Sequence, residues 1–222
     1  MVIYGVKHKI YNIFILEILI LFGIIFVGGI MELLKKAIAS KAKVCENHVL
    51  RVDSFLNQFV DIDLVNQMAL EWKRLYKNSK ITKILTIESS GIALATAAGF
   101  AFGVPVVFAK KEYTTRIPDN SLAAKIYSYT MKKSYYAYVP EEYINEDDVV
   151  LIIDDVIANG WTAEGLIDIV CQASATLEGL GVAIEKTYQS GGARLRTKGI
   201  RVESLVKIKD LDHENCQVIF AD

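Results

Sequence analysis

The central stretch of the chain reads Val149-Val150-Leu151-Ile152-Ile153-Asp154-Asp155-Val156-Ile157-Ala158-Asn159-Gly160-Trp161-Thr162-Ala163. Its five leading apolar residues predict a strand that is buried on both faces of a parallel sheet. Two carboxylates follow at the carboxyl end of this strand, and a short loop comes after them. Beyond the loop the apolar residues recur at helical spacing. The stretch therefore predicts a strand, a loop and a helix of an α/β fold.

Such folds bind ligands outside the carboxyl ends of their strands, and a loop that leads into a helix presents free N–H groups to anions. Gly160 permits a tight turn and Thr162 adds a hydroxyl donor. Asp154 and Asp155 suit sugar hydroxyls or a phosphate-bound cation, although on their own they are equally consistent with a helix cap or a solvent-facing pair. Together with the loop they predict a sugar-phosphate site.

Composition bounds the class of protein. The 222 residues are 52% hydrophobic and carry a formal net charge of −1, so we expect one good-sized core and no general nucleic-acid surface. The three cysteines, Cys45, Cys171 and Cys216, are scattered and lack the spacing of zinc ligands. A reduced, cytoplasmic protein is the simplest expectation.

The first thirty residues differ from the rest. Residues 10–30 are almost wholly apolar and follow Lys7 and Lys9, a pattern long enough for a transmembrane helix. Gly28-Gly29-Ile30 is a poor cleavage site for a signal peptide. The codons implied by residues 27–31 resemble a ribosome-binding sequence followed by a start codon. We therefore expect residues 1–30 to be an N-terminal extension, with the native start at Met31, in preference to a membrane anchor.

From residue 31 onward the predicted elements alternate between helices and strands. Helices are expected over 33–43, 64–76 and 92–102, and strands over 84–87, 105–109, 149–153 and 180–184. This order predicts one α/β domain over residues 31–222. Each of the four strands ends in polar residues, so the chemistry should gather at one edge of the sheet.

Several groups at this edge are candidates for binding charged ligands. Glu88-Ser89-Ser90-Gly91 offers hydroxyls and a glycine turn before a helix, which suits pyrophosphate, although serine is also a routine helix cap. Lys110 and Lys111 can neutralise pyrophosphate or simply be solvated at a strand end. Lys186 follows an apolar strand that delivers it to the edge where the two acids lie; a surface lysine is the alternative.

The stretch 112–138 has little apolar periodicity and many hydroxyl side chains. An irregular connection of this length is usually a lid or a disordered loop. A lid would exclude water from a reactive sugar centre. A β-hairpin built from the tyrosine-rich half is the alternative, and both descriptions can hold together.

The run 149–163 resembles the phosphoribosyl-pyrophosphate (PRPP) motif of the type I phosphoribosyltransferases, and it departs from that motif at Asn159, where the family often has threonine. Five further segments look like the bacterial xanthine phosphoribosyltransferases: 49–58, 84–93, 126–130, 184–189 and 199–205. The resemblance covers essentially all of residues 31–222. The PRPP motif alone identifies a superfamily, whereas the segment with Leu50 and Asn57, taken with Glu185-Lys186, is much more specific.

This resemblance implies the type I phosphoribosyltransferase fold, a central and mostly parallel twisted sheet flanked by helices, with a small hood and a flexible lid loop. It also implies transfer of 5-phosphoribosyl from PRPP to N9 of xanthine in purine salvage, which gives xanthosine 5′-monophosphate and pyrophosphate. Mg²⁺ is expected to accompany PRPP. Members of the family are homodimers, and no nucleic-acid partner is expected.

The resemblance further implies a role for each candidate residue. The 5-phosphate would be held by backbone amides of Ala158, Asn159, Gly160, Trp161 and Thr162, and the catalytic acids at the ribose would be Asp154 and Asp155. Xanthine would be bound by Leu50, Asn57 and Lys186. Pyrophosphate would be bound by a second loop with Glu88, Ser89, Ser90 and Gly91, together with Lys110. No side chain is assigned as a direct ligand of a metal.

Two other classes of protein remain open on the sequence alone. A PRPP-sensing regulator can use the same fold without catalysis, but it needs a DNA-binding module that the apolar first thirty residues cannot supply. A purine phosphoribosyltransferase that prefers adenine, or hypoxanthine and guanine, is the nearer alternative.

Overall fold

The computed structural model describes residues 29, 31–45, 49–128 and 132–221. Apart from residue 29, the predicted N-terminal extension lies outside these residues, and so does the question of an anchor or a start at Met31. Within the described ranges, no helix combines the length and the apolar character that a membrane crossing requires.

Eight strands form the central sheet. They are β3 Lys83–Ile87, β4 Val106–Glu112, β5 Ser121–Ser128, β6 Lys133–Pro140, β7 Val149–Ile157, β8 Thr176–Lys186, β9 Val202–Asp212 and β10 Gln217–Phe220. Their order across the sheet is β10-β9-β8-β7-β3-β4-β6-β5. The strands β9, β8, β7, β3 and β4 run parallel to one another, and antiparallel pairs lie at both ends of the sheet. The predicted mostly parallel sheet is confirmed.

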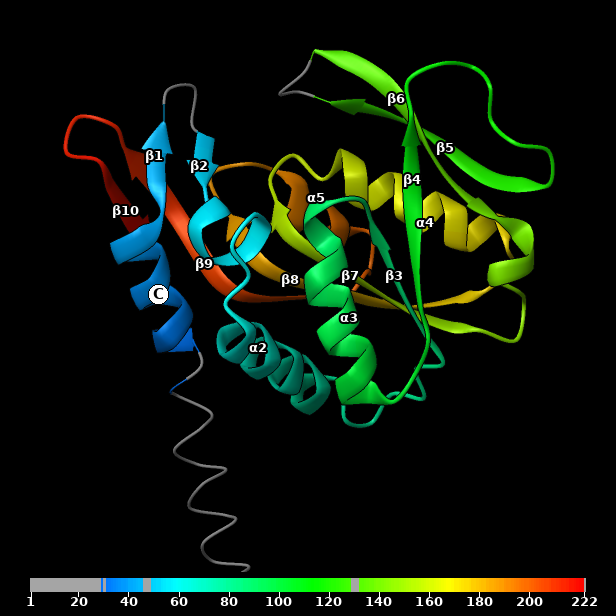
Figure 1. Ribbon diagram of the computed structural model, residues 1–222, viewed down its shortest axis with the longest axis horizontal. Helices are drawn as coiled ribbons and strands as arrows, with labels where there is room; N and C mark the ends of the chain where they lie inside the picture. Colours follow the sequence, from blue (N-terminus) through cyan, green and yellow to red (C-terminus); the bar gives the residue numbers. More distant parts are fainter. Residues whose placement is uncertain (1–28, 30, 46–48, 129–131, 222) are drawn as a thin grey trace, which may run out of the picture.

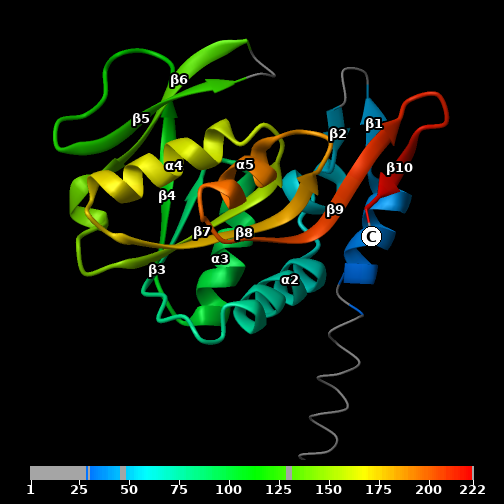
Figure 2. The same ribbon diagram turned by 180° about the vertical axis from the view of Figure 1, so that it is seen from behind.

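Helices cover both faces of this sheet. α2 Ile62–Leu75 and α3 Ser90–Phe102 lie on the face toward the viewer in Figure 1, whereas α4 Trp161–Gln172 and α5 Gly191–Thr197 lie on the face seen in Figure 2. α2 begins after Asp61, whose carboxylate accepts the backbone N–H of Leu64 at 3.3 Å and so caps the helix. α3 ends at Gly103, which has a left-handed φ of 75°.

The continuous apolar run of β7 is explained by these two layers. Leu151 and Ile153 pack in the core cluster that contains residues of α2 and α3, and Val150 and Ile152 pack in the cluster that contains residues of α4. Successive residues of a strand point to opposite faces, so a strand covered on both sides must be apolar at every position. The core thus fixes β7, and β7 carries the two acids to its carboxyl end.

A small hood lies beside the sheet. It consists of a helix over residues 31–41, the antiparallel strands β1 Lys43–Cys45 and β2 Val49–Arg51, and the π-helical turn η1 Asp53–Asn57. The helix predicted over 33–43 therefore begins and ends two residues too late, because the chain leaves the helix at residue 42 and pairs β1 with β2. The ammonium group of Lys35 lies 6.0 Å from the ring centroid of Phe220, so the C-terminal strand packs beside the hood helix.

The tyrosine-rich stretch forms the antiparallel hairpin of β5 and β6, with Tyr127 opposite Ser134. The hairpin interpretation of this stretch is confirmed, while its tip at 129–131 lies outside the described residues. The turn η2 Glu141–Tyr143 and the strands β9 and β10 have no counterpart among the elements predicted from the sequence. β4, β7 and β8 each run two to four residues beyond the predicted ends, so their polar residues lie within strands.

Candidate active site

A cavity of about 600 Å³ opens at the carboxyl edge of the sheet. The loop after β7 forms its floor, the β5–β6 hairpin covers one side, and β2 and the end of β8 close the other. Its lining residues are Val49, Lys111, Tyr113, Tyr127, Ser128, Lys132, Tyr135, Ile152, Asp154, Val156, Ile157, Ala158, Asn159, Gly160, Trp161, Thr162, Ala163, Leu180, Lys186 and Gln189. All five predicted phosphate-loop residues are among them.

The loop is shaped by glycine and by its own side chains. Gly160 has a φ of 83°, which L side chains rarely adopt, and it caps the start of α4. The side-chain oxygen of Asn159 accepts the backbone N–H of Trp161 at 3.2 Å. Asn159 therefore shapes the loop itself, as a short polar cap does, in place of the hydroxyl that the family motif often carries. Thr162 shares a hydrogen bond with the Tyr135 hydroxyl of β6, which ties the hairpin to the loop.

The two acids form a hydrogen-bonded pair at the end of β7. An Asp154 carboxylate oxygen accepts the backbone N–H of Asp155 at 3.0 Å, and Asp155 accepts the backbone N–H of Val156 at 2.9 Å. Burial, and then the negative charge of Asp155, raise the pKa of Asp154 well above its usual range. Lys111 opposes this shift from across the cavity. A pair of neighbouring carboxylic acids in which one pKa is strongly shifted is typical of a functional site.

The three residues predicted for the base pocket are only partly brought together. Lys186 is buried and lines the cavity; burial lowers its pKa, and Asp155 partly offsets the shift. The side-chain nitrogen of Asn57 donates to Asp155 at 3.1 Å, so η1 delivers Asn57 to the acids. Leu50 does not line the cavity but packs in the core beneath the hood. Its neighbour Val49 lines the cavity, because successive strand residues point to opposite sides.

The second predicted loop lies beside the acids, outside the cavity lining. A Glu88 carboxylate oxygen accepts the backbone N–H of Lys111 at 2.6 Å, and Ser89 is exposed before the start of α3 at Ser90. A Cβ atom on Gly91 would lie 3.4 Å from Asp154, so this loop closely approaches the acid pair.

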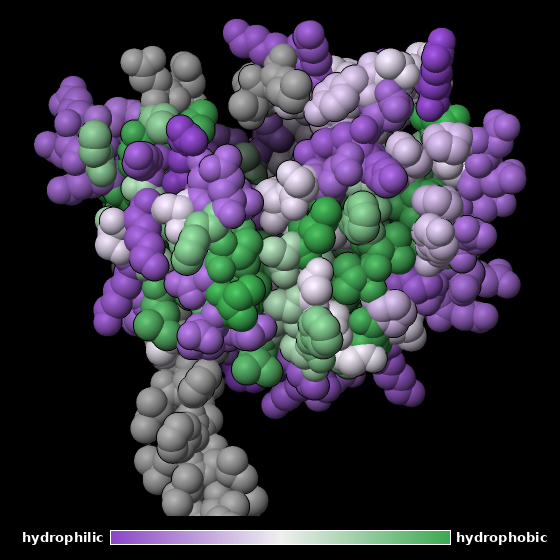
Figure 3. All heavy atoms as spheres, viewed as in Figure 1, coloured by the Kyte–Doolittle hydropathy of each residue, from purple (hydrophilic) through white to green (hydrophobic). Residues whose placement is uncertain are grey.

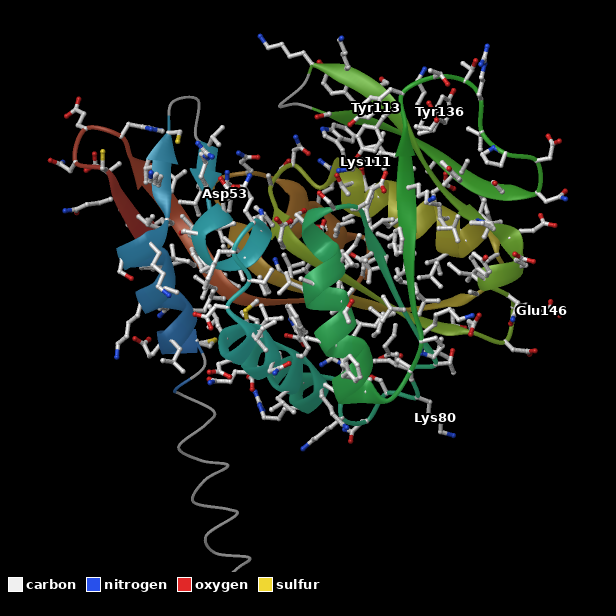
Figure 4. The ribbon with its side chains drawn as sticks, in the orientation of Figure 1. Asp53, Lys80, Lys111, Tyr113, Tyr136 and Glu146 are labelled. Carbon is white, nitrogen blue, oxygen red and sulfur yellow. The ribbon has the colours of Figure 1, made fainter. Side chains whose placement is uncertain are left out.

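Lys110 of the predicted diphosphate site is exposed and does not line the cavity, whereas its neighbour Lys111 does. Figure 4 shows Lys111 and Tyr113 on the side of β4 toward the middle of the molecule. The Lys111 ammonium lies 5.6 Å from the ring centroid of Tyr135. The sequence analysis treated the lysine pair as the end of a strand over 105–109. The sequence could have indicated Lys111, because it lies two residues after the buried Ala109 and residues i and i+2 of a strand share one face.

Several cavity residues had no assigned role in the sequence. They come from the segment after β4, from the hairpin and from the segment after β8: Tyr113, Tyr127, Ser128, Lys132, Tyr135 and Gln189. Among the described residues, no group of three or more His, Cys, Asp or Glu side chains is placed to hold a metal ion.

Solved structures define the class of protein. Adenine phosphoribosyltransferase from Rhodothermus marinus matches with a TM-score of 0.67 at 24% identity, over 82% of this chain and 99% of that one. The adenine phosphoribosyltransferase from Trypanosoma brucei, in complex with AMP, pyrophosphate and ribose-5-phosphate, has a TM-score of 0.68 at 22% identity, over 82% and 83% of the two chains. The fold is the type I phosphoribosyltransferase fold.

Sequence relatives define the family within that class. A xanthine phosphoribosyltransferase from Oceanobacillus iheyensis is 49% identical over 181 residues, which are 82% of this chain and 93% of the relative. Another from Clostridium novyi is 47% identical over 190 residues, 86% of this chain and 99% of the relative. No protein-family model matches the sequence. The chain belongs to the xanthine phosphoribosyltransferase family.

Proposed function

We propose that this protein transfers the 5-phosphoribosyl group of PRPP to N9 of xanthine, giving xanthosine 5′-monophosphate and pyrophosphate in purine salvage. The observation that carries the proposal is the convergence of loop 158–162, Asp154 and Lys186 on one cavity. The loop suits a phosphate, the carboxylate suits a sugar, and the ammonium suits a carbonyl oxygen of the base. Pyrophosphate release from PRPP that depends on added xanthine tests the proposal.

The chemistry follows from where charge develops. The bond from C1 of the ribose to pyrophosphate breaks, N9 of xanthine bonds to C1, and N9 loses its proton. Positive charge grows on the ribose meanwhile, and Asp154 and Asp155 stabilise it electrostatically. The loop 158–162 and Lys186 hold the two substrates in place, which supplies proximity. The β5–β6 hairpin covers the cavity and keeps water from the reactive centre.

Mg²⁺ fits the acid pair and the substrate. This ion prefers oxygen ligands and is usually bound through one or two carboxylates together with substrate phosphates. Asp154 and Asp155 supply such carboxylates beside the loop at Gly91. The ion would neutralise the departing pyrophosphate, and Lys111 adds a second positive charge on that side of the cavity.

Base selection rests on Lys186 and Asn57. Lys186 has only donors, so it suits O6 of a 6-oxopurine and opposes the amino group of adenine. With its nitrogen bonded to Asp155, Asn57 presents its side-chain oxygen, which is buried and has no hydrogen-bond partner among the described residues. That oxygen can accept an N–H of the base.

Lys186→Gln should lower kcat/KM for xanthine by roughly tenfold to a hundredfold, because a charged hydrogen bond to the base becomes a neutral one. Adenine should be rejected less strongly by this variant, since glutamine also offers an acceptor. Steady-state kinetics with each base measure both effects. Lys125→Gln, an exposed lysine of β5, is the matched control. Unchanged kinetics with xanthine in Lys186→Gln would show that Lys186 does not bind the base.

The pH dependence should report Asp154. Because its pKa is raised in the free protein, protonation inactivates the site at a higher pH than an ordinary aspartate would, and kcat/KM for PRPP should fall as the pH falls through that range. Asp154→Asn should lose this acid limb in its residual activity. An acid limb that persists unchanged in the variant assigns the titration to another group.

We also propose a homodimer in the cytoplasm, with the catalytic domain formed by residues 31–222. α3 is apolar on nearly all sides, and its Phe100 is 85% exposed; Leu70 of α2 and Phe108 of β4 are exposed as well. Figure 3 shows hydrophobic side chains gathered on this face. An apolar patch of this kind on a soluble protein usually marks an interface, and a second copy of the chain would cover it.

A further inference from the structure

The short helix α5 packs directly against the phosphate loop from outside the cavity. The backbone N–H of Gly191 donates to the carbonyl oxygen of Ala158 at 3.0 Å. A Cβ atom on Gly191 would lie 2.5 Å from that oxygen and 2.6 Å from the backbone nitrogen of Gly160. No side chain fits there, so the backbones of α5 and of the loop are in contact. The position of the loop therefore depends on α5.

Arg194 of α5 extends this contact with its side chain. Its guanidinium donates to the backbone carbonyl of Asn159 at 2.8 Å and to both carboxylate oxygens of Glu164, at 3.2 and 3.0 Å. The same group lies over the ring of Trp161, 4.8 Å from its centroid. One cation thus contacts the middle of the loop and the first turn of α4. Arg194 does not line the cavity.

This arrangement has a consequence for the N–H groups of the loop. The C=O and N–H of one peptide unit point in opposite directions. Arg194 holds the Asn159 carbonyl on the side of α5, so the N–H of the same peptide points away from α5. Amides fixed in this way bind an anion without the cost of ordering the loop at the moment of binding. A lysine cannot replace the planar fork, because its single ammonium cannot contact the loop, Glu164 and Trp161 in the same way.

We propose that Arg194 is a positioning residue for the 5-phosphate of PRPP: it holds loop 158–162 in the conformation that receives the phosphate without contacting the substrate itself. The inference rests on the proposed function, in which that loop binds PRPP. Phosphate contacts persist from the bound substrate to the transition state, so their loss raises KM for PRPP and leaves kcat nearly unchanged.

The test compares Arg194→Ala, Arg194→Lys and Lys198→Ala. Lys198 also binds Glu164, at 2.7 Å, but has no contact with the loop, so it is a matched control for the loss of a surface ion pair. Titration calorimetry measures Kd for PRPP with Mg²⁺ and no base, and steady-state kinetics measure KM for each substrate. Arg194→Ala should raise Kd and KM for PRPP about tenfold, with kcat and KM for xanthine within about twofold. Arg194→Lys should recover only part of the loss, and Lys198→Ala should behave as the unmodified protein.

Equal PRPP affinity in Arg194→Ala and Lys198→Ala overturns the proposal, and so does an equal rise of KM for both substrates with a matching loss of thermal stability. PRPP binding by the unmodified protein separates this failure from failure of the proposed function. If the unmodified protein binds no PRPP, the function itself is wrong; if it binds PRPP and Arg194→Ala binds it equally well, only the role of Arg194 falls.

Discussion

Asp154→Asn and Asp155→Asn should each lower kcat by a hundredfold or more while the fold stays intact. Each substitution keeps the shape of the side chain and removes a preorganised negative charge beside the ribose, and loss of such a partner costs about 3–4 kcal/mol in comparable sites. Neither carboxylate belongs to the two core clusters, so the packing of the sheet does not depend on their charge. Asp155→Asn also removes the negative charge that, after burial, raises the pKa of Asp154.

Initial rates with saturating xanthine and PRPP measure the loss, and circular dichroism checks the fold. Asp168→Asn is the matched control, because Asp168 is an exposed aspartate on α4. Near-normal kcat and KM for PRPP in both single variants would show that the two acids are not catalytic.

Arg196→Ala should destabilise the protein by about 3–5 kcal/mol, because it leaves a buried carboxylate without its cation. Glu185 is 3% exposed. Both guanidinium nitrogens of Arg196 donate to it at 2.7 Å, and the Ser204 hydroxyl donates at 2.5 Å. Glu185 precedes Lys186 on β8, so this ion pair also joins α5 to the strand that carries Lys186. Urea unfolding measures the loss.

Arg51→Ala is the control for Arg196→Ala, because Arg51 pairs with Asp53 at the exposed hood, and loss of such a pair costs at most about 1 kcal/mol. Glu185→Gln in the Arg196→Ala background should restore part of the stability, since no buried charge then remains. A loss of less than about 1 kcal/mol in Arg196→Ala would show that Glu185 is not held by this pair.

The same pair predicts how stability depends on pH. Burial alone would raise the pKa of Glu185, but the hydrogen bonds from Arg196 and Ser204 outweigh it and lower the pKa below its usual value. The folded protein therefore binds fewer protons at this site than the unfolded chain. The contribution of the pair is complete above the usual pKa of 4.5 and is lost as the pH falls through the lowered value.

Local patterns were enough to predict the framework of the protein. The buried strand that ends in Asp154 and Asp155 follows from five consecutive apolar residues, and the turn into α4 follows from Gly160. Lys186 reaches the cavity because β8 is parallel to β7 and its carboxyl end must lie at the same edge. Each of these inferences uses only neighbours in sequence and the rule that parallel strands share an edge.

Other features depend on contacts between distant segments, which no local pattern encodes. Asn57 meets Asp155 across 98 positions of the sequence, and that contact holds the side-chain nitrogen of Asn57 at the acid pair. Arg194 reaches back 35 positions to the carbonyl of Asn159. The sequence offered Lys110 and Lys111 alike because the predicted strand ended at residue 109, whereas β4 continues to Glu112 and its alternation places Lys111 in the cavity lining.

The central claim is that the cavity binds a 6-oxopurine and PRPP together and that xanthine is the preferred base. Pyrophosphate release with PRPP and Mg²⁺ should be followed for xanthine, guanine, hypoxanthine and adenine in parallel. The account predicts the highest kcat/KM for xanthine, smaller differences among the 6-oxopurines than between them and adenine, and strong rejection of adenine. Efficient turnover of adenine, or release of pyrophosphate that does not depend on any base, would contradict it.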